Sequence, residues 1–352
     1  MTPKSDIRAE ADRLRAAFEA RGAEVFEAEI LQPAGALLNL YGEDIRARAF
    51  VTHDPLRGEM MLRPDFTVPL VQRHIEASRA EARYTYAGEV FRRQEDDDTR
   101  PSEFIQVGYE VFGGSEAKAD AEVFAAMRDA LAGLPLSPAI GDLGILKAAV
   151  EDLGTPDRRK AALMRHLWRP ARFLALLDRF SRAAPPPPDA AKAGTPHVGL
   201  RSPEEILARL ALLAEEADTP PISAIDVDRL NSILSITDNA PAALATMRGL
   251  AGSGTALSFA LDAFDARLNA LAELGIEPRS LPFEASYGRT TLEYYSGFVF
   301  GFSASDIPAL PVVGTGGRYD MLTATLGAGK ALPAVGGVIR PEVILALRGS
   351  GA

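Results

Sequence analysis

The 352-residue sequence contains no cysteine, which excludes disulfide bonds, thiolate metal sites and cysteine nucleophiles. It also contains no uncharged apolar run of about 18 residues, the length that suggests a membrane span. Its first residues, MTPKSDIRAEADRLRAAF, form a charged amphipathic pattern without the apolar centre of a signal peptide. We therefore expect a cytoplasmic protein with no membrane partner.

Positive charge is scarce as well: 38 Lys and Arg residues stand against 48 Asp and Glu residues, and no basic run occurs. Nucleic-acid binders gain much of their affinity by neutralising phosphates, so we expect no nucleic-acid partner. The four histidines, at positions 53, 74, 166 and 197, lack the spacing of metal ligands. We expect neither a metal nor a cofactor.

Hydrophobic residues make up 47% of the chain, which is enough for a sizeable core. Residues 5–21 have the periodicity of a helix that buries Ile7, Ala11, Leu14 and Phe18 and ends at Gly22. Residues 60–67, 82–92 and 103–112 are predicted strands. The last two are predicted to form an antiparallel hairpin around the polar tip QEDDDTRPS.

Residues 117–131 predict a helix, and from there to about residue 274 the chain reads as helical and rich in alanine and leucine. Pro170 and the run Pro185–Pro188 interrupt this part. The sequence Ser202-Pro-Glu-Glu205 is typical of a capping box, which predicts a helix ending near residue 217.

Strand patterns return at residues 281–287, 293–302 and 311–315, followed by a helix from Arg318 and a final strand and helix over 334–347. We therefore predict an α+β fold. One domain, residues 1–352, would contain a sheet interrupted by a mostly helical insertion at about 135–275.

The predicted strand over residues 104–112 carries candidate ligand-binding side chains. Period-two alternation places Gln106 and Glu110 on one face, on either side of Gly108. The partner strand places four residues on a shared face: Tyr84, Tyr86, Gly88 and Arg92. This pattern is compatible with a small polar ligand lying against the sheet beside the glycines. From spacing alone, a solvated polar face is the alternative.

Five blocks in order resemble the histidyl-tRNA synthetase catalytic core. They are LRPDFT (62–67), GEVFRRQ…EFIQVGYEVFG (88–113), LEYYSGFVF (292–300), GGRYD (316–320) and AVGG (334–337). The resemblance implies the class II aminoacyl-tRNA synthetase fold, with a mixed, mainly antiparallel sheet flanked by helices. It also implies a dimer formed through the first motif of that class, which would lie near Pro33.

The resemblance implies a histidine-binding site, with each position carried over from the family's motifs. Its six residues are Asp65, Thr67, Arg92, Gln106, Glu110 and Tyr295. Asp65, Thr67 and Gln106 would hold the α-amino group, while Glu110 and Tyr295 would bind the imidazole. A carboxylate at each end of the site suits histidine, because Asp65 and Glu110 can form charge-assisted hydrogen bonds to the α-amino group and the imidazole. Asp65 departs from the family, which has a glutamate there.

Groups needed to activate an amino acid on ATP are replaced. Val343 stands where the family has the third-motif arginine, with Arg340 three residues earlier. Thr290 stands in the place of the family's catalytic arginine, with Arg289 one residue off, and Gln94 replaces a glutamate of the second motif. Because phosphoryl chemistry depends on preorganised cations, these losses imply that the chain is not an enzyme.

Features that serve tRNA in the family differ too. The predicted hairpin tip is acidic, Glu95-Asp-Asp-Asp98, which would repel phosphate. The sequence stops soon after the third motif, where the family continues into an anticodon-binding domain, so we expect no such domain.

This combination resembles the ATP phosphoribosyltransferase regulatory subunit family. The resemblance implies a non-catalytic subunit that acts with a short-form catalytic subunit in the first step of histidine biosynthesis. It further implies L-histidine as feedback ligand and a dimer within a hetero-octamer. A divergent histidyl-tRNA synthetase and a stand-alone amino-acid-binding paralogue are the alternative hypotheses.

Overall fold

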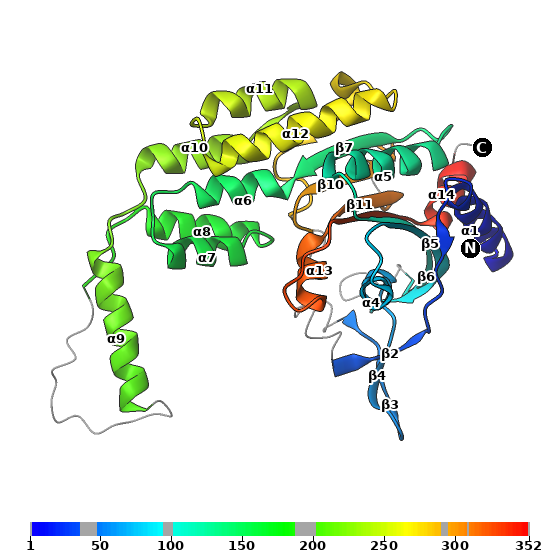
Figure 1. Cartoon of the computed structure of the whole chain (residues 1–352), viewed down its shortest axis with the longest axis horizontal. Coiled ribbons are helices and arrows are strands. Elements are labelled where there is room, and N and C mark those ends of the chain that lie inside the picture. Colours follow the sequence, from blue (N-terminus) through cyan, green and yellow to red (C-terminus); the bar gives the residue numbers. More distant parts are fainter. Residues whose placement is uncertain are drawn as a thin grey trace.

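The computed structural model describes residues 2–35, 48–93, 101–186, 202–289, 295–307 and 310–350 (Figure 1). Within these residues a nine-stranded sheet has the spatial order β1-β5-β6-β12-β11-β10-β7-β9-β8. Its strands are β1 (Glu24–Val25), β5 (Ala82–Phe91), β6 (Glu103–Phe112), β7 (Ser137–Asp142), β8 (Thr237–Asn239), β9 (Pro282–Glu284), β10 (Phe298–Ser303), β11 (Gly314–Arg318) and β12 (Ala334–Ile339).

Every pairing in this sheet is antiparallel except β1 with β5 and β7 with β9. The expected mixed, mainly antiparallel sheet is therefore confirmed, and so is the hairpin, which pairs all ten residues of β5 with β6. Residues 107–112 of β6 pair with residues 334–339 of β12. This pairing brings together two segments more than 200 residues apart in sequence.

A second, three-stranded sheet has the order β2-β4-β3 and projects from the main body at the bottom of Figure 1. It consists of β2 (Leu31–Pro33), β3 (Val51–Asp54) and β4 (Gly58–Leu62). The strand predicted over residues 60–67 is therefore only partly correct. Asp65 accepts a hydrogen bond from the Thr67 amide in a tight turn, and Thr67 starts a helix whose first turn tolerates Pro69.

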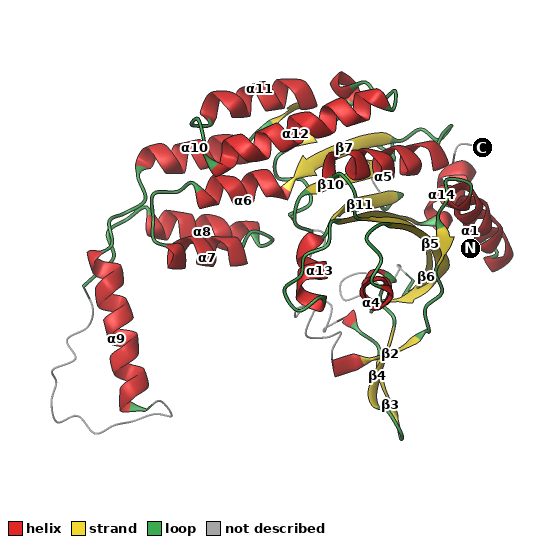
Figure 2. Cartoon of the chain, viewed as in Figure 1, coloured by secondary structure: helices red, strands yellow, loops and turns green. Residues whose placement is uncertain are grey.

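Helices cover both faces of the large sheet (Figure 2). One face carries α1 (Lys4–Glu19) and α5 (Glu116–Ala130), with α14 (Pro341–Ser350) against α1. The other face carries α4 (Thr67–Ala77) and α13 (Asp320–Leu326). Helix α1 buries Ala11, Leu14 and Phe18 as predicted, and the Phe18 ring stacks on Tyr109 with centroids 5.1 Å apart.

Most of the remaining helices lie between β7 and β9 in sequence: α6 (Leu143–Glu151), α7 (Asp157–Arg165), α8 (Pro170–Phe180), α9 (Pro203–Asp218), α10 (Ala224–Leu234), α11 (Ala240–Leu250) and α12 (Ala256–Glu273). A short 3-10 turn, η1 (Pro278–Ser280), follows them. The capping box of α9 is confirmed, because Ser202 and Glu205 exchange hydrogen bonds. Helix α12 packs on α5 and α6, while α9 projects outward (Figure 1). That residues 135–275 form an insertion with these bounds stays a prediction.

Two further expectations are wrong in detail. Strand β7 lies where helix was predicted, because the short segment around Pro138 and Gly141 has no strand periodicity and becomes a strand only by pairing with β10. Strand β11 begins at Gly314, so Arg318 ends a strand instead of opening a helix. Its glycines admit the rings of Phe300 and Tyr295, which a Cβ would displace. Among the described helices, none has the length and apolarity needed to cross a bilayer.

Candidate functional site

A cavity of about 240 Å³ opens on the face of the large sheet that carries α4 and α13. Its wall includes the six residues predicted from the sequence: Asp65, Thr67, Arg92, Gln106, Glu110 and Tyr295. The other lining residues are Arg48, Val312, Thr315, Tyr319, Gly336, Gly337, Val338 and Arg340. The cavity is somewhat smaller than the ~300–1,000 Å³ typical of drug-sized ligands, which suits a metabolite the size of an amino acid.

Glu110 forms the floor of this cavity and is 2% exposed. The hydroxyl of Tyr86 donates to its Oε1 at 2.9 Å, and that of Tyr319 donates to its Oε2 at 2.7 Å. A carboxylate has about four lone-pair sites, so two stay open for a ligand. Gly336 on β12 is required beside it, because any Cβ there would overlap with Oε2.

Burial raises the pKa of Glu110 to about 8, and the negative charge of Asp65 adds to the rise. The two tyrosine hydroxyls lower the pKa but do not offset the burial. A cationic or N–H-donating ligand would favour the ionised form. The floor therefore carries a carboxyl group whose charge is best stabilised by a bound donor.

The opposite end of the cavity is formed by the start of α4 and by β6. Asp65 is 3% exposed, and its Oδ1 accepts from the Thr67 amide at 3.0 Å. Gln106 is 2% exposed, and its Oε1 is buried without a hydrogen-bond donor among the described residues. Leaving a buried acceptor unsatisfied costs about 1–3 kcal/mol, so this oxygen indicates a ligand that donates to it.

Tyr295 closes one side of the cavity and is 6% exposed. Its ring packs closely over Gly317, since a Cβ there would lie 2.8 Å from the ring. Burial, followed by the charges of Glu110 and Asp65, raises the pKa of its hydroxyl. Tyr295 is therefore a neutral hydroxyl that can donate or accept a hydrogen bond.

Arginines line the side of the cavity away from the floor. Arg92 Nε donates to the Pro64 carbonyl at 2.7 Å, and Arg340 Nη1 donates to the Val312 carbonyl at 2.8 Å. Together with Arg48, both also line a neighbouring cavity of about 190 Å³ that contains Val343. Glu110 and Asp65 supply acidic groups and these arginines supply cations, so the cavity wall carries charges of both signs, as a zwitterionic ligand requires.

The structure corrects part of the sequence interpretation. The gap at Gly108 is filled by the ring of Tyr86, and Gly88 faces the Arg63 guanidinium, whose Nη2 would lie 2.7 Å from an added Cβ. No ligand can therefore lie against these glycines. The cavity is lined instead by Gly336 and Gly337 of β12, and the Glu110 carboxylate fills the space that a side chain at Gly336 would need. The alternative of a solvated polar face is wrong, because Gln106 and Glu110 are buried.

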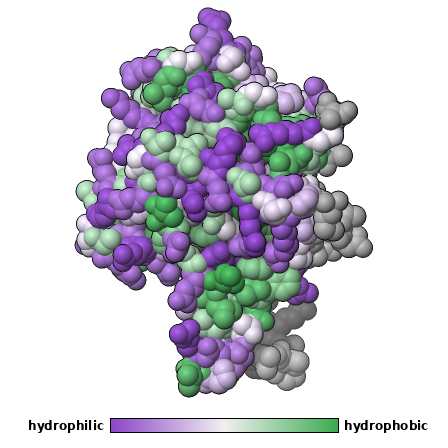
Figure 3. All heavy atoms as spheres, turned by 90° about the vertical axis from the view of Figure 1, so that its right-hand side faces the viewer, coloured by the Kyte–Doolittle hydropathy of each residue, from purple (hydrophilic) through white to green (hydrophobic). Residues whose placement is uncertain are grey.

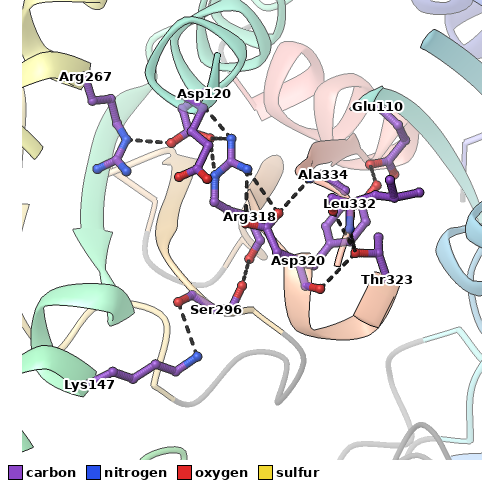
Figure 4. A network of polar contacts seen from close by, with 12 residues as sticks. Glu110, Asp120, Lys147, Arg267, Ser296, Arg318, Asp320, Thr323, Leu332 and Ala334 are labelled. Carbon is purple, nitrogen blue, oxygen red and sulfur yellow. Dashed lines mark hydrogen bonds and ion pairs between the residues drawn. The ribbon is translucent and has the colours of Figure 1, made fainter. Parts of the chain in front are cut away.

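Sequence reasoning missed a buried ion network beside the cavity (Figure 4). Asp120 of α5 is fully buried and binds Arg318 of β11 and Arg267 of α12, each at 2.7 Å. Arg267 also binds Asp142 at 2.6 Å, and Arg318 binds Asp320 at 3.0 Å. The sequence offered one signal for this network: Asp120 and Arg267 are isolated charges within helices rich in alanine and leucine. Tyr319, adjacent to this network, was missed as a cavity residue.

Only some of the positions at which the sequence predicts a lost catalytic group lie within the described residues. Val343 is 5% exposed and presents no charge to the neighbouring cavity. Thr290, Gln94 and the acidic tip at 95–98 lie outside the described residues. Arg289 is absent from the cavity lining and instead donates to the Leu167 carbonyl at 2.9 Å. In the part of the chain that the structure describes, no group of three or more histidine or acidic side chains could hold a metal.

Comparisons with known proteins identify relatives of this chain. The sequence model of the family described as "Histidyl-tRNA synthetase" matches residues 4–344. An ATP phosphoribosyltransferase regulatory subunit of Allorhizobium ampelinum is 34% identical over 91% of this chain and 92% of its own length. One of Brucella canis is 32% identical over 96% of each chain.

Solved structures agree in fold. A Bacillus halodurans protein titled as an ATP phosphoribosyltransferase regulatory subunit/histidyl-tRNA synthetase superposes with a TM-score of 0.72 at 22% identity, over 98% of this chain and 80% of that one. Histidyl-tRNA synthetase from Nostoc gives a TM-score of 0.65 at 16% identity, over 99% and 73% of the two chains. The class II synthetase-like fold is thereby confirmed.

Proposed function

The chain belongs to the histidyl-tRNA synthetase family and, within it, to the ATP phosphoribosyltransferase regulatory subunits, and on this premise we propose that it senses L-histidine for a partner enzyme. The partner is a short-form ATP phosphoribosyltransferase catalytic subunit. Their complex performs the first step of histidine biosynthesis in the cytoplasm. The observation that carries the proposal is a buried, two-ended polar cavity beside a neighbouring cavity in which Val343 takes the place of the family's third-motif arginine.

In this proposal the imidazole of L-histidine binds at the floor of the cavity. An imidazole N–H donates to Glu110, whose two remaining lone-pair sites are directed away from Tyr86 and Tyr319. Tyr295 contacts the other ring nitrogen. A charge-assisted hydrogen bond of this kind contributes about twice as much as a neutral one, so Glu110 is the main specificity determinant.

The α-amino group binds at the opposite end. It donates to Asp65, to the buried Oε1 of Gln106 and to Thr67, all of which are acceptors with little solvent exposure. The carboxylate then faces the arginine side of the cavity, where Arg92 and Arg340 lie. Each charged group of the zwitterion thus meets a group of opposite charge.

The chain is proposed to have no aminoacylation activity. Adenylation requires cations at the developing phosphate charge, and loss of one preorganised group typically lowers the rate by about 10² to 10³. Val343 supplies no charge, and Arg289 is directed to Leu167. Histidine-dependent pyrophosphate exchange at ordinary synthetase rates would contradict this part of the proposal.

Self-association is proposed through the three-stranded sheet and β1. Exposed apolar residues gather there: Val25 (46%), Ile30 (44%), Leu31 (40%), Val51 (47%) and Leu56 (97%). Figure 3 shows apolar surface on the lower projection, where β2 to β4 lie. Exposed apolar residues on one projection are typical of an interface. The dimer would then form the centre of a hetero-octamer.

Mixing the chain with a short-form catalytic subunit tests the proposal. Size-exclusion chromatography should show a single larger species, and L-histidine should inhibit the mixture more strongly than the catalytic subunit alone. A coupling free energy of about 1–3 kcal/mol corresponds to a roughly 5- to 150-fold effect. Separate elution at micromolar concentration, with histidine inhibition unchanged by mixing, would refute the proposal in favour of a stand-alone amino-acid-binding protein.

A further inference from the structure

We propose that helices α6 to α8 position Tyr295 in the cavity, with Lys147 and Arg289 as the positioning residues, so that ligand occupancy is transmitted to these helices. The identity of the ligand, L-histidine, rests on the proposed function. The contacts that carry the proposal lie outside the cavity lining and on both sides of Tyr295 in sequence.

The first contact comes from α6. Lys147 Nζ donates to the carbonyl of Ser296, the residue after Tyr295, at 3.2 Å. The amide of Leu143, the first residue of α6, donates to the carbonyl of Gly297 at 2.9 Å. One helix therefore binds two successive carbonyls directly after Tyr295.

Lys147 is held tightly in this position. Its ammonium lies 5.5 Å from the ring centroid of Trp168, a cation–π contact. Burial lowers the pKa of Lys147, while the charges of Asp142 and Asp320 act in the opposite direction. A largely buried ammonium with a carbonyl acceptor and an aromatic face has little freedom to leave the Ser296 carbonyl.

Arg289 makes the second contact, on the other side of Tyr295 in sequence. It is 4% exposed, its Nε donates to the Leu167 carbonyl at 2.9 Å, and its guanidinium lies 5.0 Å from the ring centroid of Phe173 on α8. Its Nη2 has no acceptor among the described residues. Burying a guanidinium is unfavourable unless it is hydrogen-bonded, and the Leu167 carbonyl supplies such a bond.

A third contact joins the same segment to the buried ion network. The Ser296 amide donates to the Arg318 carbonyl at 2.7 Å. Arg318 binds Asp120, and Asp120 binds Arg267 of α12 (Figure 4). Packed interiors transmit small displacements, and a chain of ion pairs and hydrogen bonds is a physical route for coupling. A shift of Tyr295 on ligand binding is therefore passed to α6, to the segment that holds Trp168, and to α12.

The chain carries an internal reporter for this coupling. Trp168 is the one tryptophan in the sequence. It follows Leu167, which accepts from Arg289, and its ring contacts Lys147, yet it does not line the cavity. Saturating L-histidine should therefore change Trp168 fluorescence, excited at the red edge where tyrosine does not absorb. The midpoint should match the dissociation constant from calorimetry.

Substitutions test the positioning role directly. Lys147→Met retains an unbranched side chain of similar length but removes the donor to Ser296, and should weaken L-histidine binding by about fivefold or more. Lys147→Arg retains a donor and should restore most of the affinity. In a Tyr295→Phe background, Lys147→Met should change the affinity by less than about twofold, because the hydroxyl that it positions is absent.

Arg159→Met is the matched control. Arg159 is 1% exposed, donates to the Pro220 carbonyl at 2.8 Å, and lies 5.1 Å from the Phe180 ring centroid, so it shares with Arg289 a backbone acceptor and an aromatic contact. It also pairs with Glu216 at 2.8 Å. It binds the helices to one another, and its contacts with described residues are with Glu216, Thr219, Pro220 and Phe180. Its loss should lower thermal stability while leaving histidine affinity and the fluorescence response unchanged.

The outcomes separate this proposal from the proposed function. Binding of L-histidine by calorimetry without any change in Trp168 fluorescence would overturn the positioning role and leave the histidine site intact, and this measurement needs no variant. Equal effects of Lys147→Met and Arg159→Met on affinity would also overturn it. Absence of any binding by the wild-type chain would overturn the histidine site, and the positioning proposal with it.

Discussion

Two clusters of buried polar side chains lie on either side of β11, and they differ in how well their charges are matched. In the network around Asp120, each carboxylate oxygen of Asp120 faces a guanidinium, and the side chains of Asp120, Arg267 and Arg318 are at most 6% exposed. In the cavity, Glu110 contacts only neutral hydroxyls and Gln106 Oε1 has no donor among the described residues. Matched buried charges indicate a structural role, whereas an unmatched set is typical of a ligand-binding site.

The largest effect is expected from breaking the matched cluster. Asp120→Asn leaves Arg267 and Arg318 with reduced charge compensation, and should lower the free energy of unfolding by about 3–5 kcal/mol. Urea denaturation measures it. Asp129→Asn is the control: Asp129 pairs with Arg21 at 2.5 Å but is 44% exposed, so its loss should cost less than about 1 kcal/mol. Equal costs for the two variants would remove the distinction.

Glu110→Gln should instead raise the free energy of unfolding at alkaline pH. The pKa of Glu110 in the folded chain is about 8, above its unfolded value, so the folded state retains a proton that the unfolded state has lost. The free energy of unfolding therefore decreases as the pH rises from about 5 to about 8, by on the order of 4 kcal/mol. The glutamine variant lacks this decrease. Urea denaturation at about pH 5 and about pH 8.5 should show the variant gaining stability relative to wild type, and parallel pH profiles would contradict the assignment.

The smallest effect is expected at Gln106. Gln106→Met removes a buried acceptor without a donor among the described residues, and should raise the free energy of unfolding by about 1 kcal/mol while weakening L-histidine binding. Denaturation and calorimetry on the same preparation measure both. Lower stability in the variant would indicate that Oε1 has a partner in the unliganded chain.

Much of the cavity could be predicted from the sequence, because β5 and β6 are consecutive in sequence and have a regular alternating pattern. Period-two alternation in β6 placed Gln106 and Glu110 together, and the hairpin brought Arg92 near them. The remaining wall comes from β11 and β12, more than 200 residues away in sequence. Tyr319 and Gly336 lie in the blocks 316–320 and 334–337 that resemble the family, but no periodicity linked these two residues to the cavity. Their roles depend on the register of β12 against β6, which the sequence pattern does not contain.

Side-chain direction was the second limit of the sequence. Residue spacing placed Tyr86 near Gly108 but could not show that the Tyr86 ring fills the space above this glycine. Spacing also could not decide whether the Arg289 side chain points into the cavity. Arg289 instead packs on Phe173, a contact across more than 100 residues. Similarly, β7 is a strand because β10 pairs with it, which overrides its weak local propensity.

The most direct test of the histidine-sensing account is the inhibition of the reconstituted complex by L-histidine, with the wild-type chain and with Glu110→Gln. Removing the charge-assisted acceptor at the cavity floor costs about 2 kcal/mol. The account therefore predicts assembly and uninhibited activity equal to wild type, with the inhibition curve displaced about 30-fold to higher histidine concentration. Superimposable inhibition curves would contradict it, because histidine would then act at a different site.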